Sequence, residues 1–257
     1  MSTVLLTSGA LPRRLQALAW PPRLYVRGAV PSDGPAVAIV GARSASAEGM
    51  ARATRIARHL AERHVHVVSG GALGIDGAAH RGALAGRGTT TVVLGNGLDI
   101  AYPARHAPLF RDVLATGGGL AGLQPDGVQP RPGMFPQRNP LIAALADAVL
   151  VIEADVRSGS LSTAAAAQRI GRVVAAWPGS RGCDRLLAGG AALLEGEADV
   201  ERVLAGTPRF APRPLHDDTT RAVSAAIAAG AHDVDAIVRR TGLPVRAVLR
   251  ALPLLER

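Results

Sequence analysis

Apolar positions along the chain form short runs that alternate with longer stretches of helical spacing. Strand-length runs occur at 36–40, 65–69, 90–95, 148–154 and 172–179. Apolar residues recur three and four apart between Met50 and Arg63, and further helices are predicted after Gly74, near 105–115 and from Ser160. This alternation predicts an α/β fold, a doubly wound and mostly parallel sheet with its ligand at the carboxyl ends of the strands.

The flanks of this pattern suggest further parts. Residues 1–35 are predicted to be an N-terminal extension, with a possible short helix and an extended, proline-led stretch "WPPRLYVRG". Residues 36–204 form the predicted α/β domain, and the proline-rich stretch 205–218 is typical of a linker. Residues 219–257 predict three short amphipathic helices, the last two separated by "TGLP". Such a turn is typical of DNA-binding helix-turn-helix units, but many helical hairpins that only pack look the same.

Composition changes this picture little. No window of about 18 apolar residues occurs, and the arginines near the N-terminus follow its apolar run, the reverse of a signal peptide. With the single cysteine, Cys183, this favours a cytoplasmic protein without a disulfide. The net charge of +9 and pI near 11.3 suggest a polyanionic partner, but all 29 basic residues are arginine, and the excess is spread evenly along the chain. A GC-rich coding bias explains the same composition.

Two glycine-rich turns are candidate anion sites. In "SGGALGIDG", glycines 70, 71, 74 and 77 let backbone amides approach a ligand at the start of a helix. In "VGARSAS", Gly41 permits close approach and Arg43 is a candidate phosphate clamp, although such a turn occurs in most doubly wound sheets. The spacing is not GxGxxG, and Ser69 stands where a dinucleotide site needs an acid, which disfavours dinucleotide binding.

Three further groups of residues carry candidate chemistry. Asp76 and His80 lie four apart on one helical face, as an acid/base pair or as residues that orient a loop. The stretch "RSGSLSTA" predicts a cup of amides and hydroxyls at a helix start, without a P-loop lysine. Phe135 is predicted in a loop beside Arg138 and Asn139, where it would stack on a base; alternatively it is a core residue.

Eight motifs together resemble one family. "PPRLYVRG", "AIVGAR", "SGGALGIDGAAH", "VLGNGLDIAYP", "FPQRNPLI", "VIEADVRSGSLSTA", "AWPGS" and "RLLAGGAALL" are similar, in order and spacing, to the DNA-processing proteins DprA and Smf. The resemblance covers roughly residues 20–195, and more loosely the C-terminal helices, which resemble a winged-helix tail that stops before its wing. It departs from the family at Leu73, Gln137 and Pro140, where arginines are usual.

The resemblance implies a Rossmann-like domain that holds single-stranded DNA and loads the RecA recombinase in natural transformation, typically as a homodimer. It implies no enzyme activity, catalytic residue, metal or cofactor. The candidate nucleic-acid-binding residues are Gly41, Arg43, Ser69, Gly70, Gly71, Gly74, Asp76, His80, Phe135, Arg138, Asn139, Ser158, Gly159, Ser160 and Thr163.

Two alternatives remain open for the same cleft. One is a nucleotide-binding enzyme that resembles the phosphoribohydrolases of the cytokinin-activating type; those carry PGGxGTxxE, whereas "RSGSLSTA" has no glutamate after its threonine. The other is a sensor that binds a small nucleotide.

Overall fold

The structure, a computed structural model, describes residues 2–18, 23–31, 33–211 and 218–255. The chain divides into two compact units, Met1–Ala211 and Pro212–Arg257. Residues 212–217 of the predicted linker and residues 20–22 of "WPPRLYVRG" lie outside the described residues. No helix in the described ranges is long and apolar enough to cross a membrane.

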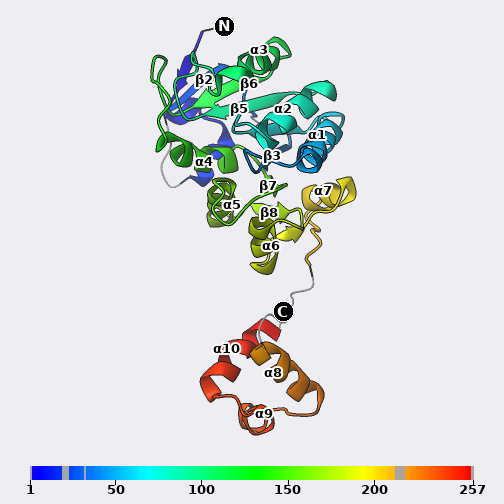
Figure 1. Cartoon of the computed structure of the whole chain (residues 1–257). Helices are drawn as coiled ribbons and strands as arrows, with labels where there is room; N and C mark the ends of the chain where they lie inside the picture. Colours follow the sequence, from blue (N-terminus) through cyan, green and yellow to red (C-terminus); the bar gives the residue numbers. More distant parts are fainter. Residues whose placement is uncertain (1, 19–22, 32, 212–217, 256–257) are drawn as a thin grey trace. The chain divides into compact units, whose positions relative to one another are not determined.

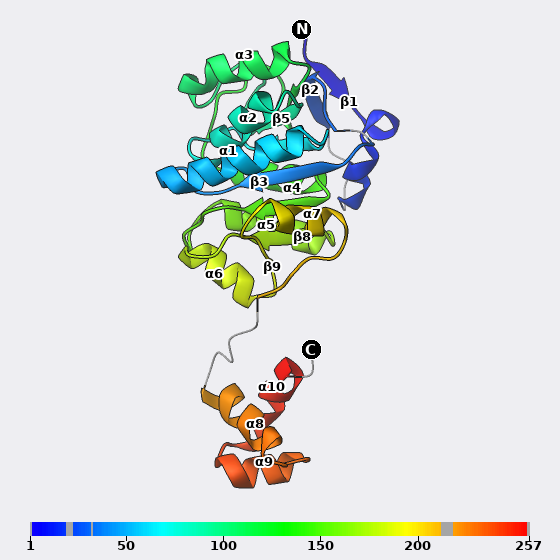
Figure 2. The ribbon, with the colours of Figure 1, turned by 90° about the vertical axis from the view of Figure 1, so that its right-hand side faces the viewer.

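The first unit is built on one mixed sheet of nine strands in its described part (Figures 1 and 2). The strand order is β1-β2-β6-β5-β4-β3-β7-β8-β9. From β6 to β9 all neighbours are parallel, while β2 pairs antiparallel with β6 and β1 antiparallel with β2. The strands are β1 Val4–Leu6, β2 Leu24–Gly28, β3 Ala36–Val40, β4 His66–Ser69, β5 Thr90–Leu94, β6 Gly119–Gly122, β7 Ala148–Val151, β8 Val173–Ala176 and β9 Ala192–Leu193.

Helices cover both faces of this sheet, so the predicted doubly wound α/β fold is confirmed (Figure 1). One face carries α1 Ala47–Ala61, α2 Ile75–Ala85, α3 Ala107–Ala115 and α7 Glu197–Leu204, and the other carries α4 Met134–Ala144, α5 Ser160–Arg169 and α6 Arg181–Ala188. Every residue of β3 is buried, as expected for a parallel strand between two helical layers. On α1, Ala53, Ile56 and Leu60 face this core at helical spacing.

Four strands, β1, β2, β6 and β9, were not predicted from the sequence, although the residues of β2 were expected to be extended. β1 and β9 are only three and two residues long. β6 has the sequence Gly-Leu-Ala-Gly, and glycine normally weakens a strand. Here it is required, because a Cβ on Gly119 would overlap the carbonyl oxygen of Ala29 beside the β2 pairing.

The predicted loop around Phe135 is wrong, because residues Met134–Ala144 form helix α4. Pro136 lies in the first turn, where no intrahelical N–H bond is needed, so it does not oppose the helix. Pro140 lies inside the helix, and the buried side chains of Leu141 and Ile142 follow it. The cost of Pro140 is limited to its own turn of the helix. Burial of the apolar side chains of the second half stabilises the whole helix and outweighs this cost.

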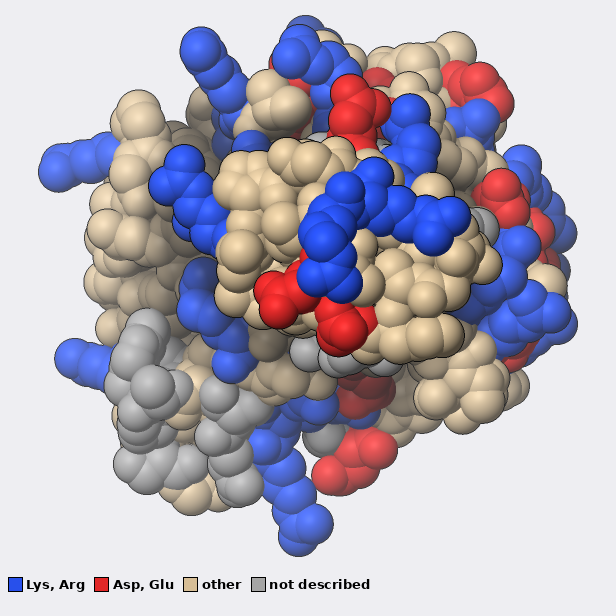
Figure 3. Space-filling view, turned by 90° about the horizontal axis from the view of Figure 1, so that it is seen from below, with Lys and Arg blue, Asp and Glu red and all other residues tan. Residues whose placement is uncertain are grey.

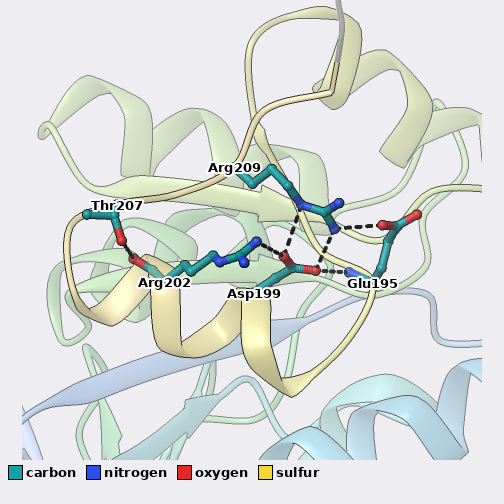
Figure 4. A network of polar contacts seen from close by, with 5 residues as sticks. All are labelled: Glu195, Asp199, Arg202, Thr207 and Arg209. Carbon is teal, nitrogen blue, oxygen red and sulfur yellow. Dashed lines mark hydrogen bonds and ion pairs between the residues drawn. The ribbon is translucent and has the colours of Figure 1, made fainter.

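Polar contacts fasten the segment after α7 to the edge of the sheet (Figure 4). The Arg209 guanidinium donates to Asp199 (3.1 and 3.2 Å) and to Glu195 Oε2 (2.6 Å). Burial acts to raise the pKa of Asp199, but the Glu195 amide and Arg209 outweigh it and the pKa is lowered. The backbone continues this attachment, because Leu193 N donates to Arg209 O and Ala192 forms a bridge with Phe210.

The second unit consists, where described, of the three predicted helices: α8 Asp218–Ala228, α9 Val234–Thr241 and α10 Val245–Leu255. Val223, Ile237 and Val248, one from each helix, are buried together. Asp233 caps α9 by accepting from Ala236 N (2.7 Å), and Gly242 at φ 68° ends it. The sequence pattern of apolar residues and caps was therefore sufficient for these helices.

Candidate nucleic-acid interface

A pocket of about 500 Å³ opens at the carboxyl ends of β3 and β7. These adjacent strands are where chain connections begin to run in opposite directions along the sheet, the usual ligand position in open α/β sheets. Its lining comes from residues 40–44, Ala72, Asp76, Phe135, Pro136, Arg138, Asn139, Ile142, Asp155, residues 157–160 and Thr163. The sequence-predicted turns thus meet at one place, together with the start of α4.

Arg138 is the central charge of this pocket. Its side chain is only 5% exposed, yet Nε and Nη1 have no hydrogen-bond partner. Burial lowers the pKa of Arg138 to about 10, against the attraction of Asp76, so the guanidinium stays charged at neutral pH. A buried cation with free donors is costly unless an anion binds it.

Gly70 makes room for this guanidinium. A Cβ at position 70 would overlap Nη1, Nη2 and Cζ of Arg138. The role predicted for Gly70 was an amide that approaches phosphate; the geometry instead gives it the task of admitting Arg138. Both residues line a smaller hollow of about 80 Å³, which also contains Leu73 and Tyr102.

Asp76 lies beside this cation and is itself buried. Burial raises its pKa, while Arg138, the Ala72 amide, the Ser69 hydroxyl and Arg43 act in the opposite direction. Its Oδ2 accepts from Ala72 N at 3.2 Å, so this amide of the glycine-rich turn already has a partner. Asp76 therefore shapes the turn and balances Arg138.

Arg43, Phe135 and Tyr102 form a layered group that lines the smaller hollow, and Arg43 and Phe135 also line the pocket. The Arg43 guanidinium carbon lies 5.4 Å from the centre of the Phe135 ring. Tyr102 stacks on the same ring, with centroids 5.3 Å apart and planes inclined by 27°. Phe135 is half-buried, neither a core residue nor an open platform, whereas Tyr102 is 43% exposed.

The predicted cup at the start of α5 is present at the pocket, but most of its donors are used internally. Ser160 N donates to Ser158 Oγ (3.3 Å), and the two hydroxyls are 2.7 Å apart. Asn139 of α4 donates to Gly159 O (3.2 Å) and to Ser162 Oγ (2.5 Å). These bonds hold α4 and α5 together and leave the arginines as the main anion-binding groups.

The N-terminus of α1, the phosphate position of a dinucleotide fold, is filled by a carboxylate of the chain itself. Glu153, just after β7, accepts from Ser46 N (3.0 Å) and from the Ser46 hydroxyl (2.5 Å). A Cβ on Gly49 would overlap this carboxylate. An anionic side chain at this end repels phosphate, which agrees with the predicted lack of dinucleotide binding.

Four predicted site residues line neither the pocket nor the smaller hollow, because they serve the fold. Ser69 donates to Ile39 O (2.6 Å), and Gly71 and Gly74, at φ 70° and 73°, pass close to Val92 and to Ala42. His80 is fully buried, and its Nδ1 lies 2.8 Å from Thr90 Oγ1.

Of the two interpretations of Asp76 and His80, the acid/base pair is wrong, whereas the orientation of a neighbouring loop is confirmed for Asp76, which accepts from Ala72 N. Since the Thr90 hydroxyl donates to Val67 O, it accepts from His80 Nδ1, and Nε2 is left without a partner. Burial, followed by His106 and Arg138, lowers the pKa of His80 to about 3. A neutral histidine in the interior takes no part in the pocket.

Several lining residues were missed from the sequence, among them Ser44, Asp155 and Arg157 in the pocket and Tyr102 in the smaller hollow. Ser44 and Arg157 lie within the motifs "VGARSAS" and "RSGSLSTA", so the predicted site residues beside them in the sequence could have indicated them. Tyr102 is far from Phe135 in sequence, and only the adjacency of β4 and β5 brings it to this edge.

Comparison with known proteins identifies sequence relatives over nearly the whole chain. Residues 2–205 match the family profile described as DNA recombination-mediator protein A, and residues 207–256 match the DprA winged helix domain. A putative DNA processing protein DprA of Mycobacterium tuberculosis is 43% identical over 236 residues, 86% of this chain and 60% of that protein. Protein Smf of Escherichia coli is 42% identical over 172 residues, 66% of this chain and 46% of that protein. The chain thus spans about half to three fifths of the length of these relatives.

Solved structures agree with the sequence matches. DNA processing protein A of Streptococcus pneumoniae superposes with a TM-score of 0.70 at 32% identity, over 82% of this chain and 75% of that one. The protein of Helicobacter pylori, whose structure concerns its single-stranded DNA binding mode, gives a TM-score of 0.71 at 29% identity, over 80% of this chain and 97% of that one.

Proposed function

The chain belongs to the DNA recombination-mediator protein A family, the DprA and Smf proteins, and from this premise we propose that it binds single-stranded DNA in the pocket at the carboxyl ends of β3 and β7. The observation that carries the proposal is Arg138, a buried charged side chain that lines the pocket and has two nitrogens without a hydrogen-bond partner. A phosphate of the strand would supply a further acceptor for the guanidinium, in addition to the charge of Asp76. Arg43, which also lines the pocket, would contact a second phosphate.

Binding, rather than catalysis, is the activity that the site supports. Asp76 is committed to the Ala72 amide and to balancing Arg138, and His80 is away from the pocket. We therefore assign the pocket residues to holding a polyanion.

Salt dependence tests this proposal. If Arg43 and Arg138 each neutralise one phosphate, log K for a poly-dT strand should fall with log salt with a slope of about 1 to 2 per chain. A duplex of matched length is the control. Preference for the duplex would transfer binding to the helix-turn-helix of the second unit, and absence of binding to either at low salt would contradict the proposal.

A small nucleotide is the second candidate ligand, because the pocket volume of about 500 Å³ lies in the range of small-ligand sites. Competition distinguishes the two: free mononucleotides should displace the oligonucleotide only weakly if the site holds a strand. Strong displacement by one nucleotide would favour a sensor, and release of its base would favour a hydrolase.

We also propose, from family membership, that the chain acts as a homodimer that protects single strands and loads RecA on them in transformation. Sedimentation would show the dimer, and nuclease protection the shielding. RecA-dependent strand exchange on DNA coated with a single-strand binding protein would be faster with the chain present. No acceleration would contradict the loading role and leave strand binding intact.

A further inference from the structure

We propose that a strand longer than the pocket continues on both sides of it, along a line of unpaired arginines at the carboxyl edge of the sheet. We call Arg105 and Arg131 the β5/β6 arm and Arg157 and Arg181 the β7/β8 arm. The inference rests on the proposed function, since it extends the same binding site.

Topology places the two arms on opposite sides of the pocket. Arg131 lies between β6 and α4, and Arg105 lies in the 3-10 helix Ala104–His106 that follows β5. Arg157 follows β7, and Arg181 begins α6 after β8. Because β6, β5, β4, β3, β7 and β8 are parallel neighbours in that order, the arms flank the pocket along one edge.

Arginines that lack an ion pair with a described residue also occur elsewhere in the unit, for example Arg81 and Arg111, so the position of the arm arginines at the carboxyl edge is what sets them apart. On the α1 side, Arg55, Arg58 and Arg63 are bound to Glu197, Glu62 and Glu201 at 2.6 to 2.8 Å. The four arm arginines are exposed, and none forms an ion pair or side-chain hydrogen bond with a described residue. Their charge is therefore available to a partner.

Carboxylates at the same edge face the backbone. Asp99 accepts from Gly127 N (2.8 Å), Asp155 from Val156 N (2.7 Å) and Asp184 from Gly179 N (2.9 Å). Each shapes the loop that carries it, and the amide offsets part of its charge. The arginines remain the outward charges of these loops.

The spacing suits an extended polyanion. Six neighbouring strands about 4.8 Å apart give an edge of roughly 24 Å, longer than the pocket alone and sufficient for several nucleotides. Figure 3 shows basic (blue) and acidic (red) side chains interspersed over the face in view. Arginines arranged in a line along the sheet edge favour binding of an extended strand over binding of a compact anion.

The test measures two oligonucleotide lengths on the full chain. Fluorescence anisotropy would give the affinity of dT strands of about 4 and about 12 nucleotides at low salt. Arg105→Ala/Arg131→Ala should weaken the longer strand about tenfold and lower its salt slope by about 1.4. Arg181→Ala, which leaves Arg157 in the pocket lining, should weaken the longer strand about threefold and lower the slope by about 0.7. The shorter strand, held by the pocket, should change less than about twofold.

A matched control is Arg111→Ala/Arg169→Ala, which removes two exposed arginines, also without ion pairs to described residues, in α3 and in the last turn of α5. This variant should bind both lengths as the unsubstituted chain does. Arm variants that match the control, or a loss confined to one arm, would overturn the two-sided path while short-strand binding upholds the pocket. Failure of the unsubstituted chain to bind either length would instead contradict the proposed function.

Discussion

Gly70 and Arg138 show how one residue without a side chain decides the electrostatics of the pocket. A sequence that reads Ser-Gly-Gly indicates a tight turn, and the sequence interpretation assigned its amides to phosphate. The structure gives Gly70 a steric task instead, because the Arg138 guanidinium occupies the space of its missing Cβ. This role of Gly70 depends on a contact between the end of β4 and helix α4, which are far apart in the sequence. Neither local sequence pattern predicts that contact.

Gly70→Ala should therefore reduce strand affinity without unfolding the chain. The added methyl group must displace the end of the Arg138 side chain, which can move because its terminal atoms are flexible. Misplacing one charged phosphate contact should cost about 1–3 kcal/mol of binding. Oligonucleotide titration and thermal unfolding measure the two effects. Gly133→Ala is the control, since position 133 has open space and an ordinary φ of −64° at the start of α4.

Tyr102, rather than Phe135, offers an accessible aromatic face. Phe135 already contacts both Arg43 and Tyr102, while Tyr102 is 43% exposed. Tyr102→Ala should lower strand affinity by about 1–3 kcal/mol with little change in melting temperature. Phe135→Ala should lower both affinity and melting temperature, because Phe135 also supports its neighbours. If Phe135→Ala lowered only the affinity and Tyr102→Ala lowered both affinity and melting temperature, the base would stack on Phe135 instead.

Helix α1 illustrates how one element is completed by another. Its first turn receives the carboxylate of Glu153, which comes from the end of β7 and bonds to Ser46. Ser46 in turn accepts from Gly49 N at 2.9 Å, so the cap and the acid act together.

Glu153→Ala should lower the free energy of unfolding by about 1–2 kcal/mol, because the helix loses both the acceptor and the favourable charge at its positive end. Chemical denaturation would measure the loss. Glu48→Ala removes an acid from the same first turn that only pairs with Arg52 on the exposed surface, and it should cost about 0.5 kcal/mol. Equal losses in the two variants would show that the Glu153 contacts add nothing beyond a surface charge.

Elements with strong local signals were predictable, and those made by their surroundings were not. The apolar runs of β3, β4 and β5 and the apolar spacing of α1 correspond to the observed elements. Strand β6 exists because β2 and β5 pair with it on both sides, and α4 exists because Leu141 and Ile142 are buried. The candidate site was predictable to the same extent: Arg43 and Arg138 follow from local motifs, whereas Tyr102 depends on strand order.

At the scale of the whole molecule, buried neutral imidazoles set the response to acid. Burial and Arg14 lower the pKa of His66 to about 4, and burial lowers that of His80 from 6.5 to about 3. As pH falls through 6.5, the unfolded chain takes up protons at these positions while the folded chain does not. Unfolding is thereby favoured, so stability is complete above about pH 6.5 and declines toward pH 3 to 4.

His80→Asn isolates this effect. The asparagine amide can replace Nδ1–H as the donor to Thr90 while removing the titrating group. Between about pH 4.5 and 6.5, the free energy of unfolding of the unsubstituted chain should fall by up to about 1.4 kcal/mol per pH unit for each buried histidine, and the variant should lose one such contribution to the slope. Burial raises the pKa of Asp76, so this group changes stability with pH in the opposite direction, but it is present in both chains and cancels in the comparison.

His64→Asn is the control for loss of a surface imidazole, because position 64 is exposed and its φ of 59° is one that asparagine tolerates. Denaturant titrations at several pH values give the slopes directly, and an unchanged slope in His80→Asn would mean that His80 takes up its proton over the same pH range in the folded and the unfolded chain.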